Sequence, residues 1–203
     1  MKNQRLEPYL PQSTFLSISK ILSQHKVALK ITRPRVTKLG DYRPPQNGHP
    51  HRVSINNNLN KYAFLITLLH EIAHMKNWEK HEDKVKPHGQ EWKTIFRELI
   101  LPFIGLNIFP DDVMRTLANY MKNPAAASCT DTVLLKALKK HDQQINPYLE
   151  EFPEKTIFKL ANAKNGKRVF QKGEKLRKRY KCVEVNSKRT YLVSAVAEVE
   201  AIQ

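Results

Sequence analysis

The sequence predicts an α+β fold in two units, and three observations support this class. Apolar residues recur at helical spacing through much of the stretch between residues 61 and 122. Short segments with the alternation typical of strands precede this stretch, and a second group of them follows residue 156. We therefore expect a domain of helices and a small sheet over residues 1–124, a linker with a connecting helix over 125–153, and a small basic β unit over 154–203.

The first domain is expected to begin with one helix and three strands. Residues 11–25 carry apolar side chains on one helical face, and Ser13 or Thr14 can cap this helix. Strands are expected where the chain alternates, over residues 27–32, 36–42 and 52–56. Pro34 cannot donate a hydrogen bond to a sheet, so it belongs to the turn between the first two strands or to an edge.

A long helix is expected over residues 61–77, and it carries the segment H-E-I-A-H at residues 70–74. Residues four positions apart lie on the same face of a helix, so His70 and His74 can direct two imidazoles at one metal ion. Glu71 follows the first imidazole and can serve as a general base without being a ligand. This arrangement is the H-E-x-x-H signature of zinc peptidases.

A catalytic zinc site usually takes a third protein ligand and leaves one position open. We rank His88 first, because it follows a charged loop and opens a helical pattern, from which it can face back toward the first two histidines. Glu91 or Glu98 ranks second and would give a His–His–Glu set. His81 ranks third, because its position does not fit the metzincin spacing.

The elements after the motif are expected in the order helix, helix, linker and strands. A helix over residues 89–101 should end at Pro102, and a short helix should follow over about 111–121. A change of composition at residues 123–128 marks the boundary, and residues 132–144 suit the connecting helix. Three or four strands are then expected over residues 157–160, 168–171, 176–185 and 190–199, with turns at Asn165-Gly166 and Asn186-Ser187.

Positive charge is concentrated near the C-terminus. The net charge is +16 with a pI near 9.9, and residues 155–189 alone carry +11, which suggests a polyanionic partner such as nucleic acid. The predicted contact residues are the densest basic run, Arg177, Lys178, Arg179 and Lys181. Among the interleaved aromatics, Phe158 and Phe170 are expected in the core of the sheet, whereas Tyr180 and Tyr191 suit either the core or stacking on bases.

The composition also bears on the compartment. No run of about eighteen apolar residues occurs, so we expect no membrane span. The first residues lack the apolar stretch of a signal peptide, and the two cysteines, Cys129 and Cys182, are too far apart in sequence to suggest a disulfide framework. A reducing, cytoplasmic location is the simplest interpretation.

The motif residues resemble those of the SprT-like domain, the family of bacterial SprT proteins and the metazoan Spartan protease. The similarity consists of the H-E-x-x-H segment, thirteen further residues, and then His88-Gly89-x-x-Trp92. Residues 37–43 and 51–56 are similar to the hairpin that precedes the active-site helix in that family, so the resemblance covers roughly residues 8–122. It implies a zincin-like metalloprotease domain, with zinc on His70, His74 and His88 and a general base at Glu71.

One feature of the family is missing. Its members often continue into a zinc ribbon with four cysteines, and this chain has two cysteines and no C-x-x-C pair. The basic β unit therefore stands where relatives carry a ribbon.

The resemblance implies a zinc metalloendopeptidase that acts on DNA-associated or DNA-crosslinked proteins, in DNA–protein crosslink repair, with DNA as a partner and a protein as substrate. Two alternatives remain open. One is a nucleic-acid-binding protein with a non-proteolytic zinc site, and the other is a cytoplasmic metallopeptidase unrelated to DNA. For the group that stabilises the oxyanion, His81, Tyr42 and Arg43 are candidates.

Overall fold

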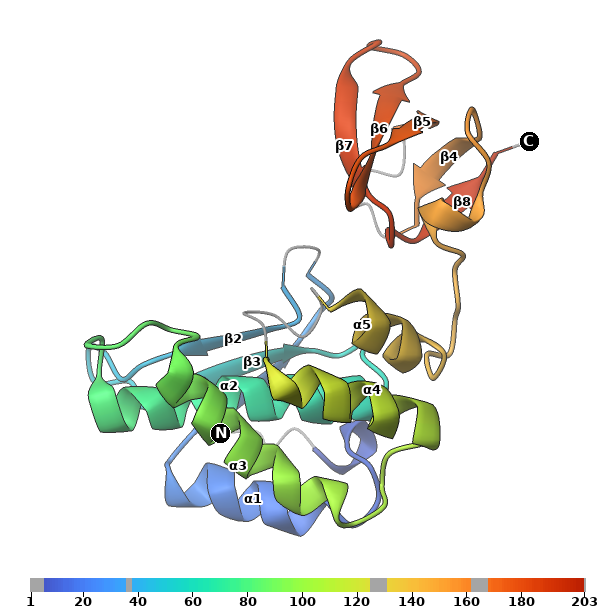
Figure 1. Ribbon diagram of the computed structural model, residues 1–203. Coiled ribbons are helices and arrows are strands. Elements are labelled where there is room, and N and C mark those ends of the chain that lie inside the picture. Colours follow the sequence, from blue (N-terminus) through green and yellow to red (C-terminus); the bar gives the residue numbers. More distant parts are fainter. Residues whose placement is uncertain (1–5, 36–37, 125–130, 162–167, 203) are drawn as a thin grey trace. The chain divides into compact units, whose positions relative to one another are not determined.

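The computed structural model describes residues 6–35, 38–124, 131–161 and 168–202. The chain forms two compact units, Met1–Gln143 and Gln144–Gln203, and it contains both helices and sheets, which confirms the α+β class (Figure 1). The boundary expected after residue 124 adjoins residues 125–130, which lie outside the described residues. Beyond it, α5 (Thr132–Lys139) does not act as a linker, because Leu134, Ala137 and Leu138 are buried in the core of the first unit.

The first unit builds a mixed three-stranded sheet. Its strands are β1 (Ala28–Thr32), β2 (Gly40–Arg43) and β3 (Arg52–Asn56), in the order β1-β3-β2. β1 runs parallel to β3, and β2 runs antiparallel to it. The first two strands of the sequence are therefore not neighbours. β3 lies between them because Val53 and Ile55, which are almost fully buried, form the apolar centre of the sheet. The start of the expected second strand, residues 36–37, lies outside the described residues.

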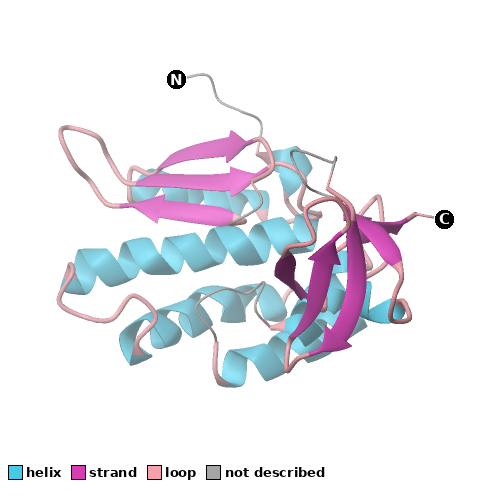
Figure 2. Cartoon of the chain, turned by 90° about the horizontal axis from the view of Figure 1, so that it is seen from above, coloured by secondary structure: helices cyan, strands magenta, loops and turns pink. Residues whose placement is uncertain are grey.

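The helix α2 (Lys61–His81) is the centre of the first unit. It contacts β2 and β3 on one side and α3 (Gln90–Ile104) on another, and Figure 2 shows it running alongside the sheet. Its residues from Ala63 to Ala73 are all buried, so it is apolar around most of its circumference. Asn60 caps its N-terminus by accepting hydrogen bonds from the backbone N–H groups of Tyr62 and Ala63. A helix held in this way gives a rigid support to the side chains that it carries.

Several helix boundaries differ from the sequence expectations. α2 continues four residues past Asn77. α3 continues through Pro102 to Ile104, because Phe103 is buried in the core and its packing stabilises the last turn of the helix. Thr14 occupies the N-cap of α1 (Phe15–Gln24), but its hydroxyl donates to the carbonyl of Pro11 and does not cap the helix. The 3-10 turn η1 (Glu7–Tyr9) and the helix α4 (Asp111–Lys122) complete the unit.

The second unit is an antiparallel sheet of five strands. They are β4 (Ile157–Leu160), β5 (Phe170–Lys175), β6 (Arg179–Glu184), β7 (Thr190–Ser194) and β8 (Val199–Ala201), in the order β7-β6-β5-β4-β8. The 3-10 turn η3 (Leu149–Glu151) precedes them. The expected strand over residues 190–199 is wrong as a single element, because the chain turns after Ser194 and returns to pair β8 with β4. The expected turn at Asn165-Gly166 lies outside the described residues.

The core of the second unit settles the role of its aromatics. Phe158, Phe170 and Tyr180 are buried, and Tyr191 packs against them while partly exposed. β5 runs to Lys175, past the expected end at residue 171, and its register shifts between Lys172 and Lys175.

In the described residues, no helix is both long and apolar enough to cross a bilayer.

Candidate metal centre

Three histidine side chains from two segments converge in the first unit. α2 contributes His70 and His74, one turn apart, and His88 lies two residues before α3. The Nε2 atom of His70 lies 3.2 Å from Nε2 of His74 and 3.4 Å from Nε2 of His88. The three ligand nitrogens lie within 4.8 Å of one another, and the described residues contain no other such group of metal-ligating side chains.

These spacings fit a single tetrahedral metal ion. With zinc–nitrogen distances of about 2.0–2.1 Å and tetrahedral angles, two ligand nitrogens lie about 3.3 Å apart. A neutral imidazole has one N–H, so three Nε2 atoms that face one point cannot all be satisfied by one another. Nδ1 of His70 is buried and finds no hydrogen-bond partner among the described residues, which leaves Nε2 as the nitrogen through which this ring interacts. The donor set therefore suits a cation with three imidazole ligands.

The protonation state of the rings agrees with a ligand role. Burial, reinforced by the neighbouring His74 and His88, lowers the pKa of His70 to about 3. Burial and the adjacent His88 lower the pKa of His74 to about 3, and burial also lowers the pKa of His88. All three rings are therefore neutral near pH 7, which is the form that binds a metal.

An aromatic wall holds the three rings in place. The centroid of the Trp92 ring lies 4.6 Å from that of His70, 5.3 Å from that of His74 and 4.8 Å from that of His88. Phe96, one turn further along α3, stacks on Trp92 at 5.0 Å, and both side chains are fully buried. The His88-Gly89-x-x-Trp92 segment thus contributes one of the three histidines and also the aromatic surface against which all three pack.

The competing candidates for the third ligand do not join the cluster. Glu91 and Glu98 are exposed on α3, and His81 is the last residue of α2. His81 lies seven positions after His74, which corresponds to about 10 Å along a helix. The structure thus brings together the residue that was ranked first, His88, with the two histidines of the motif.

Glu71 is a buried carboxyl group that packs against β2. Its side chain is 7% exposed, and it lies so close to Gly40 that a Cβ atom added there would be 2.4 Å from Oε1. Burial raises the pKa of Glu71 to about 8, and the charge of Asp41 adds to this effect. The charges of Arg35 and Lys38 and a hydrogen bond from the Tyr42 backbone act in the opposite direction and lower the pKa of Glu71. A cation bound by the adjacent histidines would also favour the carboxylate.

A chain of two hydrogen bonds and one ion pair, from Tyr42 to His25, was missed by sequence reasoning. The Tyr42 hydroxyl lies 3.0 Å from Nδ1 of His51, whose Nε2 lies 3.5 Å from Oε1 of Glu79. The same carboxylate oxygen lies 2.9 Å from Nδ1 of His25. These residues come from four separate segments, so no local pattern reveals them. Of the three oxyanion candidates, Tyr42 is thus engaged with His51, and Arg43 is paired with Asp41 at 3.2 Å.

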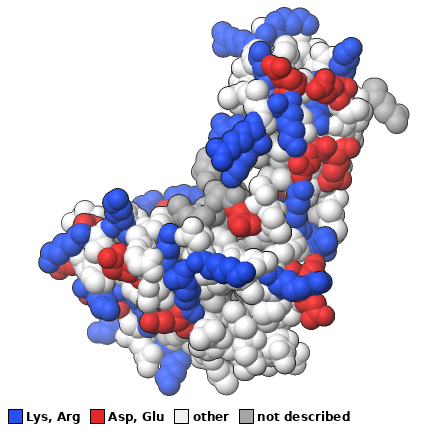
Figure 3. Space-filling model, in the orientation of Figure 1, with Lys and Arg blue, Asp and Glu red and all other residues white. Residues whose placement is uncertain are grey.

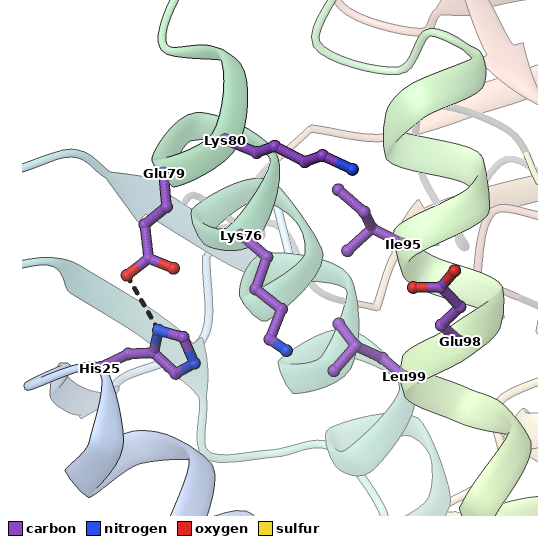
Figure 4. Close-up of a pocket in the computed structure, with 7 residues that line it drawn as sticks. All are labelled: His25, Lys76, Glu79, Lys80, Ile95, Glu98 and Leu99. Carbon is purple, nitrogen blue, oxygen red and sulfur yellow. Dashed lines mark hydrogen bonds and ion pairs between the residues drawn. The ribbon is translucent and has the colours of Figure 1, made fainter.

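A separate hollow of about 410 Å³ lies between α2 and α3. Figure 4 shows Lys76, Glu79 and Lys80 of α2 on one side of it, and Ile95, Glu98 and Leu99 of α3 on the other, with His25 bonded to Glu79. Its lining contains both signs of charge and none of the three clustered histidines. Glu98, which the sequence offered as an alternative ligand, belongs to this hollow.

The predicted nucleic-acid residues lie on the second unit. Arg177 and Lys178 lie in the loop between β5 and β6, Arg179 and Lys181 lie on β6, and all four are exposed. Arg179 and Lys181 alternate with the buried Tyr180 and Cys182, so they point away from the core. Figure 3 shows basic side chains over much of the visible face of this unit, with acidic ones among them. Lys181 is paired with Glu174 at 3.5 Å.

Comparison with known proteins gives one match. Residues 12–108 match the model of the SprT-like family. No curated protein and no solved structure matches the chain. The matched segment runs from the loop before α1 to the loop after α3 and contains every residue of the histidine cluster.

Proposed function

We propose that the chain is a zinc-dependent metalloendopeptidase, because residues 12–108 match the model of the SprT-like family. The observation that carries this proposal is the convergence of three imidazole nitrogens at 3.2–3.4 Å on the helix that also carries Glu71. His70, His74 and His88 would hold the ion, and Glu71 would act as the general base. When bound, zinc supplies a Lewis acid that polarises a carbonyl group and lowers the pKa of water to about 7.

The residues of the chain account for the proton transfers. Glu71 would accept the proton of the attacking water and then deliver it to the nitrogen of the leaving amine. The three imidazoles would stay neutral throughout and would take no part in the proton transfers. Trp92 and Phe96 keep water away from the inner side of the rings and hold them against reorientation.

β2 is an edge strand among the described residues, and this supports binding of an extended polypeptide. β2 is at one end of the sheet order, and it contacts α2 near Glu71. Asn56 donates its N–H to the carbonyl of Leu39, so in this antiparallel pair the N–H and C=O groups of Gly40 and Tyr42 face away from β3. The Tyr42 N–H is engaged by Glu71, so a substrate strand would add to the Tyr42 carbonyl and to the backbone groups of Gly40 by β-augmentation, which binds the backbone and needs little sequence preference.

We further propose that the substrates are DNA-associated or DNA-crosslinked proteins, which the second unit would reach by binding DNA. The support is the charge of residues 155–189 and the exposure of Arg177, Lys178, Arg179 and Lys181. DNA held by this unit would raise the local concentration of any protein attached to the same DNA. Because the DNA would hold both the enzyme and the attached protein, many unrelated proteins could be cleaved without a specific recognition pocket.

Metal removal tests the peptidase proposal. The chain is treated with a chelator, dialysed and then given back zinc, and cleavage is followed on one protein presented free and covalently linked to an oligonucleotide. We expect the chelated chain to be inactive, zinc to restore cleavage, and the linked protein to be cleaved faster. Undiminished cleavage by the chelated chain would contradict a metallopeptidase. Zinc binding without cleavage of either substrate would favour the non-proteolytic alternative, and equal rates on both would favour a peptidase unrelated to DNA.

Neutralising the basic run tests the role of the second unit. Replacing Arg177, Lys178, Arg179 and Lys181 together by glutamine should weaken DNA binding. The negative slope of log K against log salt should become shallower by about 3 to 4. Affinity is measured by fluorescence anisotropy over a range of salt concentrations. The matched control replaces four exposed lysines of the first unit, Lys20, Lys80, Lys122 and Lys140, by glutamine. A slope that falls equally in both variants would show that binding depends on net charge and not on this surface.

A further inference from the structure

Neither strand propensity nor backbone conformation explains why residue 40 of β2 is a glycine. It is the first residue of β2, and glycine in a strand is destabilising relative to residues with side chains. Among the described glycines, Gly48 alone has a positive φ, so Gly40 adopts a conformation that any residue can take. Glycine is therefore required at this position because it has no side chain, and not because its backbone is flexible.

The group that fills the space beside Gly40 is the Glu71 side chain. A Cβ atom at Gly40 would lie 2.4 Å from Oε1, 2.8 Å from Cγ and 2.9 Å from Cδ of Glu71, all closer than carbon and oxygen atoms normally approach. Gly40 pairs with Ile55, which is fully buried, so both residues face the side of the sheet that packs on α2. Glu71 rises from α2 into this space and is almost completely buried there.

We propose that Gly40 is a positioning residue, whose missing side chain forms the seat that fixes the carboxyl group of Glu71 between α2 and β2. The proposal rests on the proposed function for its catalytic consequence, but the seat itself is a feature of packing. Any side chain at residue 40 displaces the carboxyl group by the overlap of the added atom, on the order of 1 Å. A displacement of this size at a general base costs about 100-fold in rate. The strand that would bind substrate therefore also sets the position of the base.

A four-protein thermal cycle tests the seat without any activity measurement. It compares the wild type, Gly40→Ala, Glu71→Ala and the double variant. Both tryptophans, Trp78 and Trp92, lie in the first unit, so tryptophan fluorescence reports the unfolding of that unit alone. We expect Gly40→Ala to lower Tm by on the order of 5 °C in the wild-type background, as overpacking does. In the Glu71→Ala background the space is open, and the same substitution should leave Tm unchanged.

Cleavage and zinc content complete the test. Gly40→Ala should keep its zinc and lose kcat by about 100-fold with little change in KM, because the base moves while the metal ligands and the strand edge stay. Gly105→Ala is the matched control, since an added Cβ there meets its nearest atom, the carbonyl oxygen of Pro102, at an ordinary 3.7 Å. Equal losses of Tm in both backgrounds, or no loss in either, would overturn the seat. If the thermal cycle shows the coupling but no variant cleaves protein, the seat stands and the peptidase proposal fails.

Discussion

Replacing His70 by alanine is expected to abolish zinc retention. His70 lies at the centre of the cluster, because its Nε2 atom is the one within 3.4 Å of both other ligand nitrogens. Loss of a direct ligand should exceed the 10- to 100-fold that changes in the outer shell cost, so we expect the zinc affinity to fall by more than about 100-fold. Metal analysis of the purified variant, and competition with a chromophoric chelator, measure this directly.

The control for this variant is His81→Ala. His81 lies on the same helix and is absent from the cluster, so its removal should leave the zinc content at the wild-type level. Because His70 is buried, the alanine variant also loses packing, and its unfolding is therefore compared with that of the metal-free wild type. A His70→Ala protein that retains a full equivalent of zinc, or a His81→Ala protein that loses it, would contradict the assigned ligands.

Replacing Glu71 by glutamine is expected to remove proteolysis while leaving the metal in place. Glutamine fills the same space beside Gly40 but cannot accept a proton, so kcat should fall by about 10²–10⁴-fold. Burial raises the pKa of Glu71 to about 8, which means that the site disfavours the charged form. An uncharged isostere should therefore not lower Tm. Zinc content, Tm and single-turnover cleavage are measured on the same preparation.

The matched control is Glu98→Gln. Glu98 is exposed on α3 and lines the hollow of Figure 4, and the sequence had offered it as an alternative ligand. The substitution should change neither zinc content nor cleavage. Wild-type turnover by Glu71→Gln would remove the general base from the mechanism, and loss of zinc from Glu98→Gln would reopen the ligand assignment.

The centre of the site could be predicted from the sequence because its determinants are local. The four-residue spacing of His70 and His74 fixes their common face wherever the segment is helical, and the apolar run before them ensures the helix. His88 required only that the next helix pack against the first, which the pattern from Trp92 to Phe96 indicated. The strand over residues 52–56 and that over 157–160 were also found with their observed bounds, because alternation was clear in both.

The features that escaped prediction depend on contacts between distant segments. Sheet order was one of them, since nothing local shows that β3 lies between β1 and β2. The seat of Glu71 was another, because Gly40 and Glu71 are 31 residues apart and meet only when β2 packs on α2. A glycine inside an expected strand was the available signal. The link from Tyr42 through His51 to Glu79 joins three segments and left no signal at all.

The most direct test of the account is to locate the metal ion itself. Anomalous diffraction measured on both sides of the zinc absorption edge, from crystals of the full chain grown with one equivalent of zinc, places the ion without reference to activity. We expect one peak at about 2.0–2.1 Å from Nε2 of each of His70, His74 and His88, with a fourth position open to solvent. A peak elsewhere in the chain, or an ion that lacks His88 as a ligand, would contradict the central claim.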